Sequence, residues 1–226
     1  MESQVRVLIR MRDVGFALRS AAEFKQLLSR IRLQKFVYLL DVLVYLVELL
    51  PSFEGHRTYK HGPFDAAIQN AVDCLAFRGF VRVSDVQQET DGQIHSRYGL
   101  TREGVNWVEK LTSDNQFRIR ANVANSIAKQ INGVGWDRLV SLVYAEPTFV
   151  TARAFGYGTK LDTNNPLNNS AALVLHTMKH GLHAGFEETT STPDLMLELF
   201  FRYLQKFSSL KDQTSSLRRS GAGGAL

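Results

Sequence analysis

Three histidines that lie close together in the chain are the residues whose type and spacing could bind a metal ion. His176, His180 and His183 are four and three positions apart, which places them on one face of a helix. Neutral imidazoles suit zinc, and the glutamates at 187–188 could add a carboxylate. However, Gly181 weakens a helix at this point, and one helix rarely supplies a complete site. A polar helix face or a partner-contact face is the simpler interpretation, so we predict no bound metal.

No other group of residues has the spacing of a catalytic centre. The carboxylates are scattered, and the sequence contains no glycine-rich phosphate loop, no cysteine pair and no Gly-x-Ser-x-Gly motif. The one cysteine, Cys74, lies in an apolar helical pattern and is expected to be buried. We therefore predict a protein without catalytic activity and without a cofactor.

Composition indicates a globular protein with an ordinary core. The 226 residues are 44% hydrophobic and 22% charged, and the net charge of +5 permits nucleic-acid binding without requiring it. The longest apolar run, 36–50, contains Asp41 and Glu48 and is shorter than the roughly 20 residues that span a bilayer. No secretory signal is evident, so we expect a cytoplasmic location and no membrane contact.

Residues 1–112 have the pattern of a winged helix-turn-helix in a mainly α protein. A basic helical segment precedes an apolar helix at 32–50 and a third helix at 64–78, with aromatic residues such as Phe77 expected in the core. Alternating residues over 80–100, interrupted by an Asp-Gly turn signal, predict a two-stranded wing. Thr101 is a suitable N-cap for the helix that follows.

The second half of the chain predicts a separate helical region. Residues 113–211 contain several helical patterns, and the tail 212–226, rich in Ser, Gly and Arg, is expected to be disordered. The last strong helix is apolar on two faces, which is typical of a helix packed between neighbours. Near a chain end, the missing neighbour could be another protein. The candidate partner contacts are Phe200, Phe201, Tyr203 and Phe207.

The predicted third helix is poorly suited to reading DNA. Its exposed face is expected to carry Asp65, Gln69, Asn70 and Asp73, with no Lys or Arg before Arg78. The wing tip is acidic as well. If nucleic acid is bound, the candidate contacts are Arg30, Arg32, Lys35, Arg82 and Arg97, although a solvated helix face explains these charges equally well.

Three short motifs in a fixed order carry a resemblance to a known family. They are Leu33-Gln34-Lys35-x-x-Tyr38, Tyr59-x-x-Gly62-Pro63-Phe64 and Leu100-Thr101-x-x-Gly104. Over about residues 14–112 the chain resembles YwgA-like proteins and the related Panacea antitoxin domains. Its layout is similar to the middle component of bacterial ABC-three-component defence systems, such as the Lamassu anti-phage systems. The motif residues are expected to have a structural role or to contact a partner.

The resemblance implies a non-catalytic adaptor subunit that bridges an SMC-like ATPase and an effector nuclease, with DNA contacted through the complex. The alternative is a DNA-binding transcriptional regulator or antitoxin of the Panacea type. The Panacea motif usually carries a tryptophan shortly before its Tyr-Gly-Pro, and residues 55–63 have none. This departure and the long C-terminal half favour the adaptor.

Overall fold

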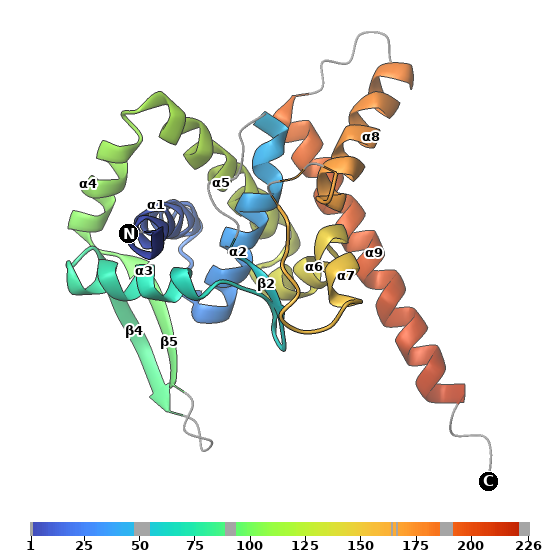
Figure 1. Cartoon of the computed structure of the whole chain (residues 1–226), viewed down its shortest axis with the longest axis horizontal. Coiled ribbons are helices and arrows are strands. Elements are labelled where there is room, and N and C mark those ends of the chain that lie inside the picture. The colour runs from blue at the N-terminus through green and yellow to red at the C-terminus, as the bar shows by residue number, and fades with distance from the viewer. Residues whose placement is uncertain are drawn as a thin grey trace.

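The computed structural model describes residues 2–47, 55–88, 94–163, 165, 167–185 and 192–221, and it is mainly helical with a small antiparallel sheet, as the sequence predicts (Figure 1). The elements in the described part, in chain order, are α1 (Glu2–Ala22), β1 (Leu28–Ser29), α2 (Arg30–Leu43), η1 (Val44–Val47), β2 (Arg57–Tyr59), β3 (Gly62–Phe64), α3 (Ala66–Phe77), β4 (Val81–Gln88), β5 (Ile94–Leu100), α4 (Arg102–Leu111), α5 (Asn115–Val134), η2 (Trp136–Arg138), α6 (Leu139–Ala145), α7 (Pro147–Arg153), α8 (Ser170–Gly185) and α9 (Pro193–Gly221).

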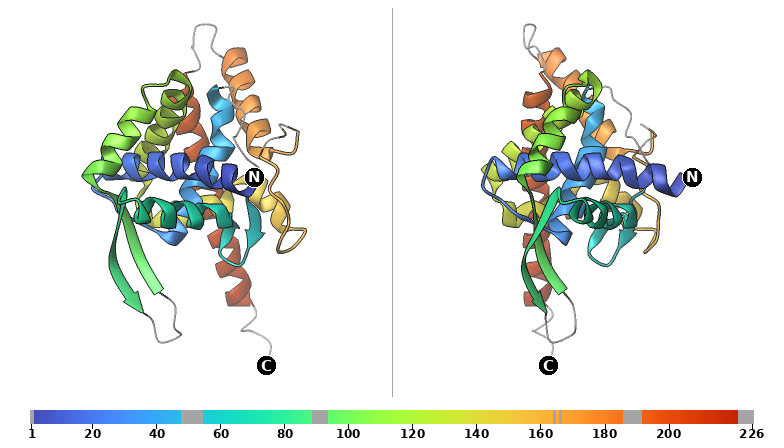
Figure 2. Two further views of the ribbon diagram at one scale, coloured as in Figure 1. Left: turned by 60° about the vertical axis from the view of Figure 1, so that its left-hand side comes forward. Right: turned by 90° about the vertical axis from the view of Figure 1, so that its left-hand side faces the viewer.

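The helix α2 lies at the centre of the molecule. Every residue from Leu33 to Leu43 is buried, and α1, α5, α6 and α8 pack around it (Figure 2). A helix that is apolar on most sides is expected to be buried in this way, because each of its sides must be covered by other elements. The α-helical geometry ends at Leu43 and continues as the short η1, whereas the sequence predicted one helix to Leu50. Residues 48–54 lie outside the described part.

The three-stranded sheet has the order β1-β5-β4, and all of its pairs are antiparallel. The long pair β4–β5 projects from the helical body, as Figure 2 shows, and its register shifts between Ser84 and Gln87. In this irregular stretch Asp85 has a φ of 51°. The predicted hairpin at 80–100 is therefore present, and its turn at 89–93 lies outside the described residues.

A second hairpin, β2–β3, was not predicted. Each of its strands is three residues long, and Pro63 lies in β3 rather than in the first turn of a helix. The helix α3 begins at Ala66 because the Asp65 side chain accepts a hydrogen bond from the N–H of Ala67 and so caps it. The predicted helix start at Phe64 was therefore wrong.

The C-terminal half packs directly on the first. The helix α5 contacts α1 and α2, α9 contacts α5 and α6, and the buried side chains of 1–112 and 113–211 belong to one apolar cluster. The helix α9 is assigned as far as Gly221, and residues 222–226 lie outside the described part, so the disorder expected of the tail at 212–226 stays a prediction. Within the described ranges, none of the helices has the length and apolar composition needed to cross a membrane.

Candidate functional site

The first sequence motif, on α2, contacts the segment that joins β3 to α3. The amide of Gln34 donates to the carbonyl of Asp65 and accepts from its N–H, both at 2.9 Å. Lys35 Nζ donates to the carbonyl of Pro63 at 2.9 Å. Both side chains are buried. They supply hydrogen-bond partners to backbone groups of Pro63 and Asp65, which are also buried. Gln34 and Lys35 therefore hold this segment against α2.

The second motif shapes the β2–β3 turn. Tyr59 pairs with Gly62, whose φ of +90° favours glycine. A Cβ atom at Gly62 would lie 2.9 Å from Nζ of Lys35, so a larger residue here would displace the end of that side chain. Gly62 and Pro63 are buried, whereas Tyr59 faces solvent.

The third motif joins α4 to the start of β4. The Thr101 hydroxyl accepts from the N–H of Gly104 at 3.0 Å and donates to the carbonyl of Gly79 at 2.7 Å. A Cβ atom at Gly104 would lie 2.0 Å from the carbonyl oxygen of Phe80, so only glycine allows this approach. Leu100 ends β5 and packs against the core. Almost all the motif residues thus stabilise the fold.

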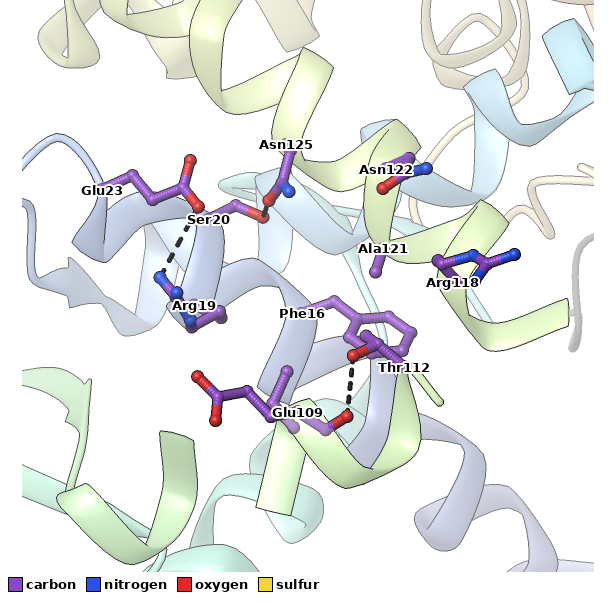
Figure 3. A pocket seen from close by; sticks show the side chains of 11 residues that line it. Phe16, Arg19, Ser20, Glu23, Glu109, Thr112, Arg118, Ala121, Asn122 and Asn125 are labelled. Carbon is purple, nitrogen blue, oxygen red and sulfur yellow. Dashed lines mark hydrogen bonds and ion pairs between the residues drawn. The ribbon is translucent and has the colours of Figure 1, made fainter. Parts of the chain in front are cut away.

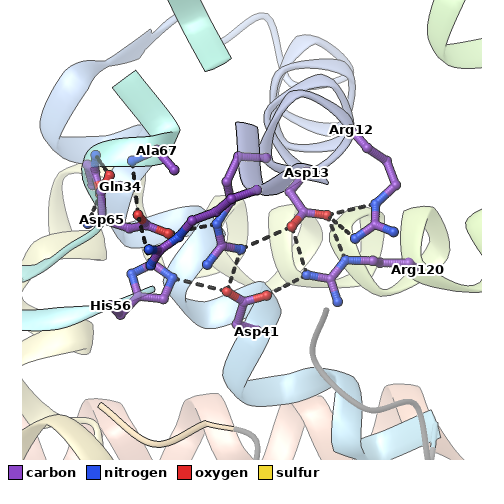
Figure 4. Close-up of polar contacts among 10 residues, drawn as sticks. Arg12, Asp13, Gln34, Asp41, His56, Asp65, Ala67 and Arg120 are labelled. Atoms are coloured by element: carbon purple, nitrogen blue, oxygen red, sulfur yellow. Dashed lines mark hydrogen bonds and ion pairs between the residues drawn. The ribbon is translucent and has the colours of Figure 1, made fainter. Parts of the chain in front are cut away.

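A buried network of charged side chains connects α1, α2, α5 and the start of α3 (Figure 4). Arg10 on α1 binds three carboxylates, those of Asp41 at 2.6 Å, Asp65 at 2.8 Å and Asp13 at 3.1 Å. Arg120 on α5 binds Asp13 at 2.8 Å and Asp41 at 2.5 Å. None of these five side chains is more than 4% exposed. Each buried carboxylate therefore has a cationic partner, without which its burial would be very costly.

The network keeps its carboxylates ionised. Burial by itself raises the pKa of Asp41, but Arg10, His56 and Arg120 outweigh this effect and hold the pKa well below its usual range. The pKa of Asp13 is likewise lowered, because Arg120 and its neighbouring arginines overcome the effect of burial. Ionised carboxylates bound to guanidinium groups are suited to joining helices rather than to accepting protons.

His56 adds a neutral group to the network. Its Nε2 lies 3.1 Å from the carboxylate of Asp41, and the side chain is fully buried. Burial lowers the pKa of His56, and although the bond to Asp41 opposes this, the pKa stays below the ordinary 6.5. A neutral imidazole that faces an ionised carboxylate must carry its proton on Nε2, so Nδ1 is left as an acceptor.

A second buried pair connects α2 to α7. The Tyr38 hydroxyl donates to the carboxylate of Glu146, which also accepts from the N–H groups of Thr148 at 2.8 Å and Phe149 at 2.7 Å. Glu146 therefore caps α7. Burial raises the pKa of Glu146, and the hydrogen bonds it accepts only partly offset this.

The predicted nucleic-acid contacts are dispersed and differ in accessibility. Arg30 and Arg82 are exposed, and Arg30 lies over the ring of Phe64. Arg97 is 3.5 Å from Asp85, and Arg32 pairs with Asp137. Lys35 was wrongly assigned to this group: it is 2% exposed, and its ammonium group is bonded to the backbone of β3, so phosphate cannot reach it.

The predicted partner contacts on α9 also need correction. Phe200 and Phe201 are fully buried, and α5, α6, α8 and η1 all pack against α9. Tyr203 and Phe207 are partly buried and stacked, with ring centroids 6.0 Å apart. The missing neighbour of this part of α9 is thus within the same chain.

The exposed face of α3 differs from the predicted one. Asp65 is 2% exposed and belongs to the buried network. Cys74 and Phe77, which were expected in the core, face solvent, and Phe77 is 95% exposed. The residues of α3 exposed together are Ala66, Asn70, Asp73, Cys74 and Phe77. This face contains no cation and ends in an aromatic ring.

The histidines of α8 form a pair in the described part of the chain. Nε2 of His176 and Nε2 of His180 lie 3.1 Å apart, and both side chains are exposed. The side chain of His183 and residues 187–188 lie outside the described part. Among the described residues, no group of three or more His, Cys, Asp or Glu is placed to hold a metal ion.

A hollow of about 200 Å³ lies between α1, α4 and α5 (Figure 3). Several of its polar groups pair with one another: the Ser20 hydroxyl donates to Asn125 at 2.5 Å, and Arg19 lies 3.6 Å from Glu23. The candidate residues from the sequence do not line it.

The sequence reasoning missed the charged residues of the network. Arg10 and Asp13 are three positions apart on α1, but their partners come from positions up to 107 residues away. The one available signal was Asp41, a charge that directly follows the apolar stretch 36–40. No protein-family model matches this chain, and no curated protein matches it either.

Proposed function

We propose that this protein is a non-catalytic adaptor subunit of a cytoplasmic anti-phage defence complex in bacteria, where it bridges an SMC-like ATPase and an effector nuclease. The observation that carries the proposal is the exposed face of α3, which has no cation and presents Phe77 at 95% exposure. The motif resemblance supplies the class of complex.

The assignment of residues 1–112 as a winged helix is part of this proposal. It is supported by the order of the helices and of the long hairpin, α1, α2, α3, β4–β5 and α4, with η1 and the short β2–β3 hairpin inserted between α2 and α3. The pairing of β1 with β5, which adds a third strand to the wing hairpin, supports it as well. In such a fold α3 would be the helix that enters a DNA groove.

The chemistry of that helix favours a protein partner. A helix that binds duplex DNA neutralises phosphates with Lys or Arg. Here the only charged member of the exposed face is Asp73, which would repel phosphate. Exposed aromatic side chains are enriched at the centres of protein interfaces, where burying them removes a large apolar area from water. Phe77 is therefore the expected anchor for a partner subunit.

Co-expression with the products of the neighbouring genes tests this proposal. We expect the wild-type chain to co-purify with an ATPase and a nuclease subunit, and Phe77→Glu to lose at least one of them. Leu167→Glu is the matched control, because Leu167 is 91% exposed but lies in the connection between α7 and α8. A wild-type chain that stays monomeric and co-purifies with none of these proteins would overturn the proposal, as would a Phe77→Glu complex of unchanged composition.

The exposed arginines on the wing and on α2 favour a second candidate function, a DNA-binding regulator or antitoxin. Arg82 and Arg30 are accessible to phosphate. This function requires salt-dependent binding of duplex DNA that weakens on charge reversal at Arg30 and Arg82. Gel-shift titrations at two salt concentrations distinguish it from the adaptor, for which the isolated chain should bind duplex weakly and without dependence on these two residues.

A further inference from the structure

The β2–β3 hairpin and the loop at 154–160 are bonded into one surface, although they are far apart in the sequence. Thr58 makes four hydrogen bonds to this loop: its N–H donates to Thr159 O at 2.9 Å, its carbonyl accepts from Gly158 N–H at 2.8 Å, and its hydroxyl donates to Gly156 O at 2.6 Å and accepts from Thr159 N–H at 3.0 Å. Figure 1 shows the connection after α7 passing beside β2. The loop is therefore held in place before any ligand binds.

Three aromatic side chains project from this surface into solvent. Tyr59 is 57% exposed at the hairpin, and Phe155 and Tyr157 are 78% and 72% exposed on the loop. Gly156 and Gly158 have φ values of +100° and +83°, a conformation that favours glycine. They lie on either side of Tyr157 in the chain and let the loop turn sharply there. Rings held on a bonded loop lose little conformational freedom when a ligand stacks on them.

The same surface is strongly basic. Residues 55–64 and 147–161 contain no Asp or Glu. Three carboxylates that flank these segments are bonded within the chain: Asp65 belongs to the buried network, Glu146 caps α7, and Asp162 accepts hydrogen bonds from the Asn165 N–H and the Asn168 amide. The fourth, Glu54, lies outside the described residues. The exposed basic side chains of the two segments are Arg57, Lys60, His61, Arg153 and Lys160.

We propose that this surface binds single-stranded nucleic acid, with bases stacked on Tyr59, Phe155 and Tyr157 and phosphates next to the basic side chains. Exposed rings set among cations are the arrangement that proteins use for unpaired strands, because every base has a face that can stack. In duplex DNA those faces are stacked inside the helix and cannot contact the three rings. An acidic peptide would pair with the cations but would not require the three exposed rings.

The surface is expected to bind with little sequence preference. Neither segment contains an Asn, Gln, Asp or Glu side chain that could read base edges, and the proposal places the Arg and Lys side chains next to phosphates rather than bases. We therefore expect oligo(dT) and oligo(U) to bind similarly and a duplex of equal length to bind much more weakly. This surface is separate from the exposed face of α3, so its activity does not depend on the adaptor function.

Fluorescence anisotropy with a labelled oligo(dT) of about 15 nucleotides tests the proposal on the full-length chain. Replacement of one aromatic side chain by alanine removes its stacking on a base, so Phe155→Ala and Tyr157→Ala should each weaken binding roughly 5- to 150-fold. Leu173→Ala is the control, because this residue is 63% exposed on α8, and it should bind as the wild type. Lys60→Ala should reduce the salt dependence of log Kd by about 0.7 for each phosphate that it no longer neutralises, whereas the aromatic variants should leave that slope unchanged.

The proposal is overturned by a wild-type chain that does not bind oligo(dT) at low salt, or by a Tyr157→Ala variant that binds it as well as the wild type does. Equal binding of duplex DNA refutes stacking. Displacement of the oligonucleotide by an equally charged poly-glutamate peptide would assign the surface to an acidic protein instead. Circular dichroism melts of every variant confirm that the comparison is between folded proteins.

Discussion

Replacement of Asp41 by asparagine should strongly destabilise the protein, because it removes one charge from the centre of the buried network. The Asp41 carboxylate contacts Arg10 at 2.6 Å, Arg120 at 2.5 Å and His56 at 3.1 Å, and it is fully buried. Asparagine has nearly the same volume, so the change creates no cavity. It leaves two buried guanidinium groups with fewer anions, and breaking a buried ion pair in this way costs about 3–5 kcal/mol.

This decrease is a large part of the roughly 5–15 kcal/mol by which a domain is stable. For a chain of this size each 1 kcal/mol lowers Tm by about 2–4 °C, so we expect a decrease of about 6–20 °C by differential scanning calorimetry at pH 7.5. Asp137→Asn is the matched control, because Asp137 also pairs with an arginine, Arg32, but is 96% exposed. Its Tm should change by less than about 4 °C. Equal decreases for the two variants would refute the reasoning that burial gives the Asp41 interactions their strength.

Three further predictions concern the titration of two buried side chains and the packing around Gly104. Burial lowers the pKa of His56, so at acid pH the unfolded chain binds a proton that the folded chain does not. The free energy of unfolding should therefore fall by up to about 1.4 kcal/mol per pH unit below about pH 6.5. In urea melts, the stability of His56→Gln should depend less on pH in this range. Burial also lowers the pKa of Lys35 to about 8, so wild-type stability should gain a rising contribution between about pH 8 and 10 that Lys35→Met lacks in the same assay. Gly104→Ala should destabilise the protein by about 1–3 kcal/mol, since its Cβ would lie 2.0 Å from the Phe80 carbonyl oxygen. Gly133→Ala, at an open position within α5, should stabilise the protein by about 0.5–1 kcal/mol. Thermal melts that rank these two variants in the opposite order would contradict the structure.

Local sequence patterns were reliable where one signal decided the outcome. The burial of α2 followed from its continuous apolar run, and the cap at Thr101 followed from a residue type whose side chain bonds the first turn of a helix. Local sequence patterns failed where the burial of an apolar side chain depends on which other elements pack over it. Phe77 and Phe200 both lie in apolar helical patterns, yet the first is 95% exposed and the second fully buried, because only the second has helices packed over it.

The β2–β3 hairpin could not be predicted because three residues are too few to show alternation. Its position depends on Gln34 and Lys35, which reach it from α2, and on Thr58, which bonds a loop about 100 residues further along the chain. The aromatic surface has no local signal in the sequence either. It is formed by the β2–β3 hairpin and the loop at 154–160, and these two segments meet only in the folded chain.

The sequence by itself determined a mainly helical chain with an apolar central helix, a long hairpin and no motif for a phosphate loop or a disulfide. The tertiary structure decided which charges are buried and which rings are exposed. Arg10, Asp41 and Arg120 come from three separate helices, and each can be buried only because oppositely charged side chains from the other helices neutralise it. A buried charge needs an oppositely charged partner at hydrogen-bond distance in the folded chain, and that partner can come from any position in the sequence. Local sequence patterns therefore do not reveal it.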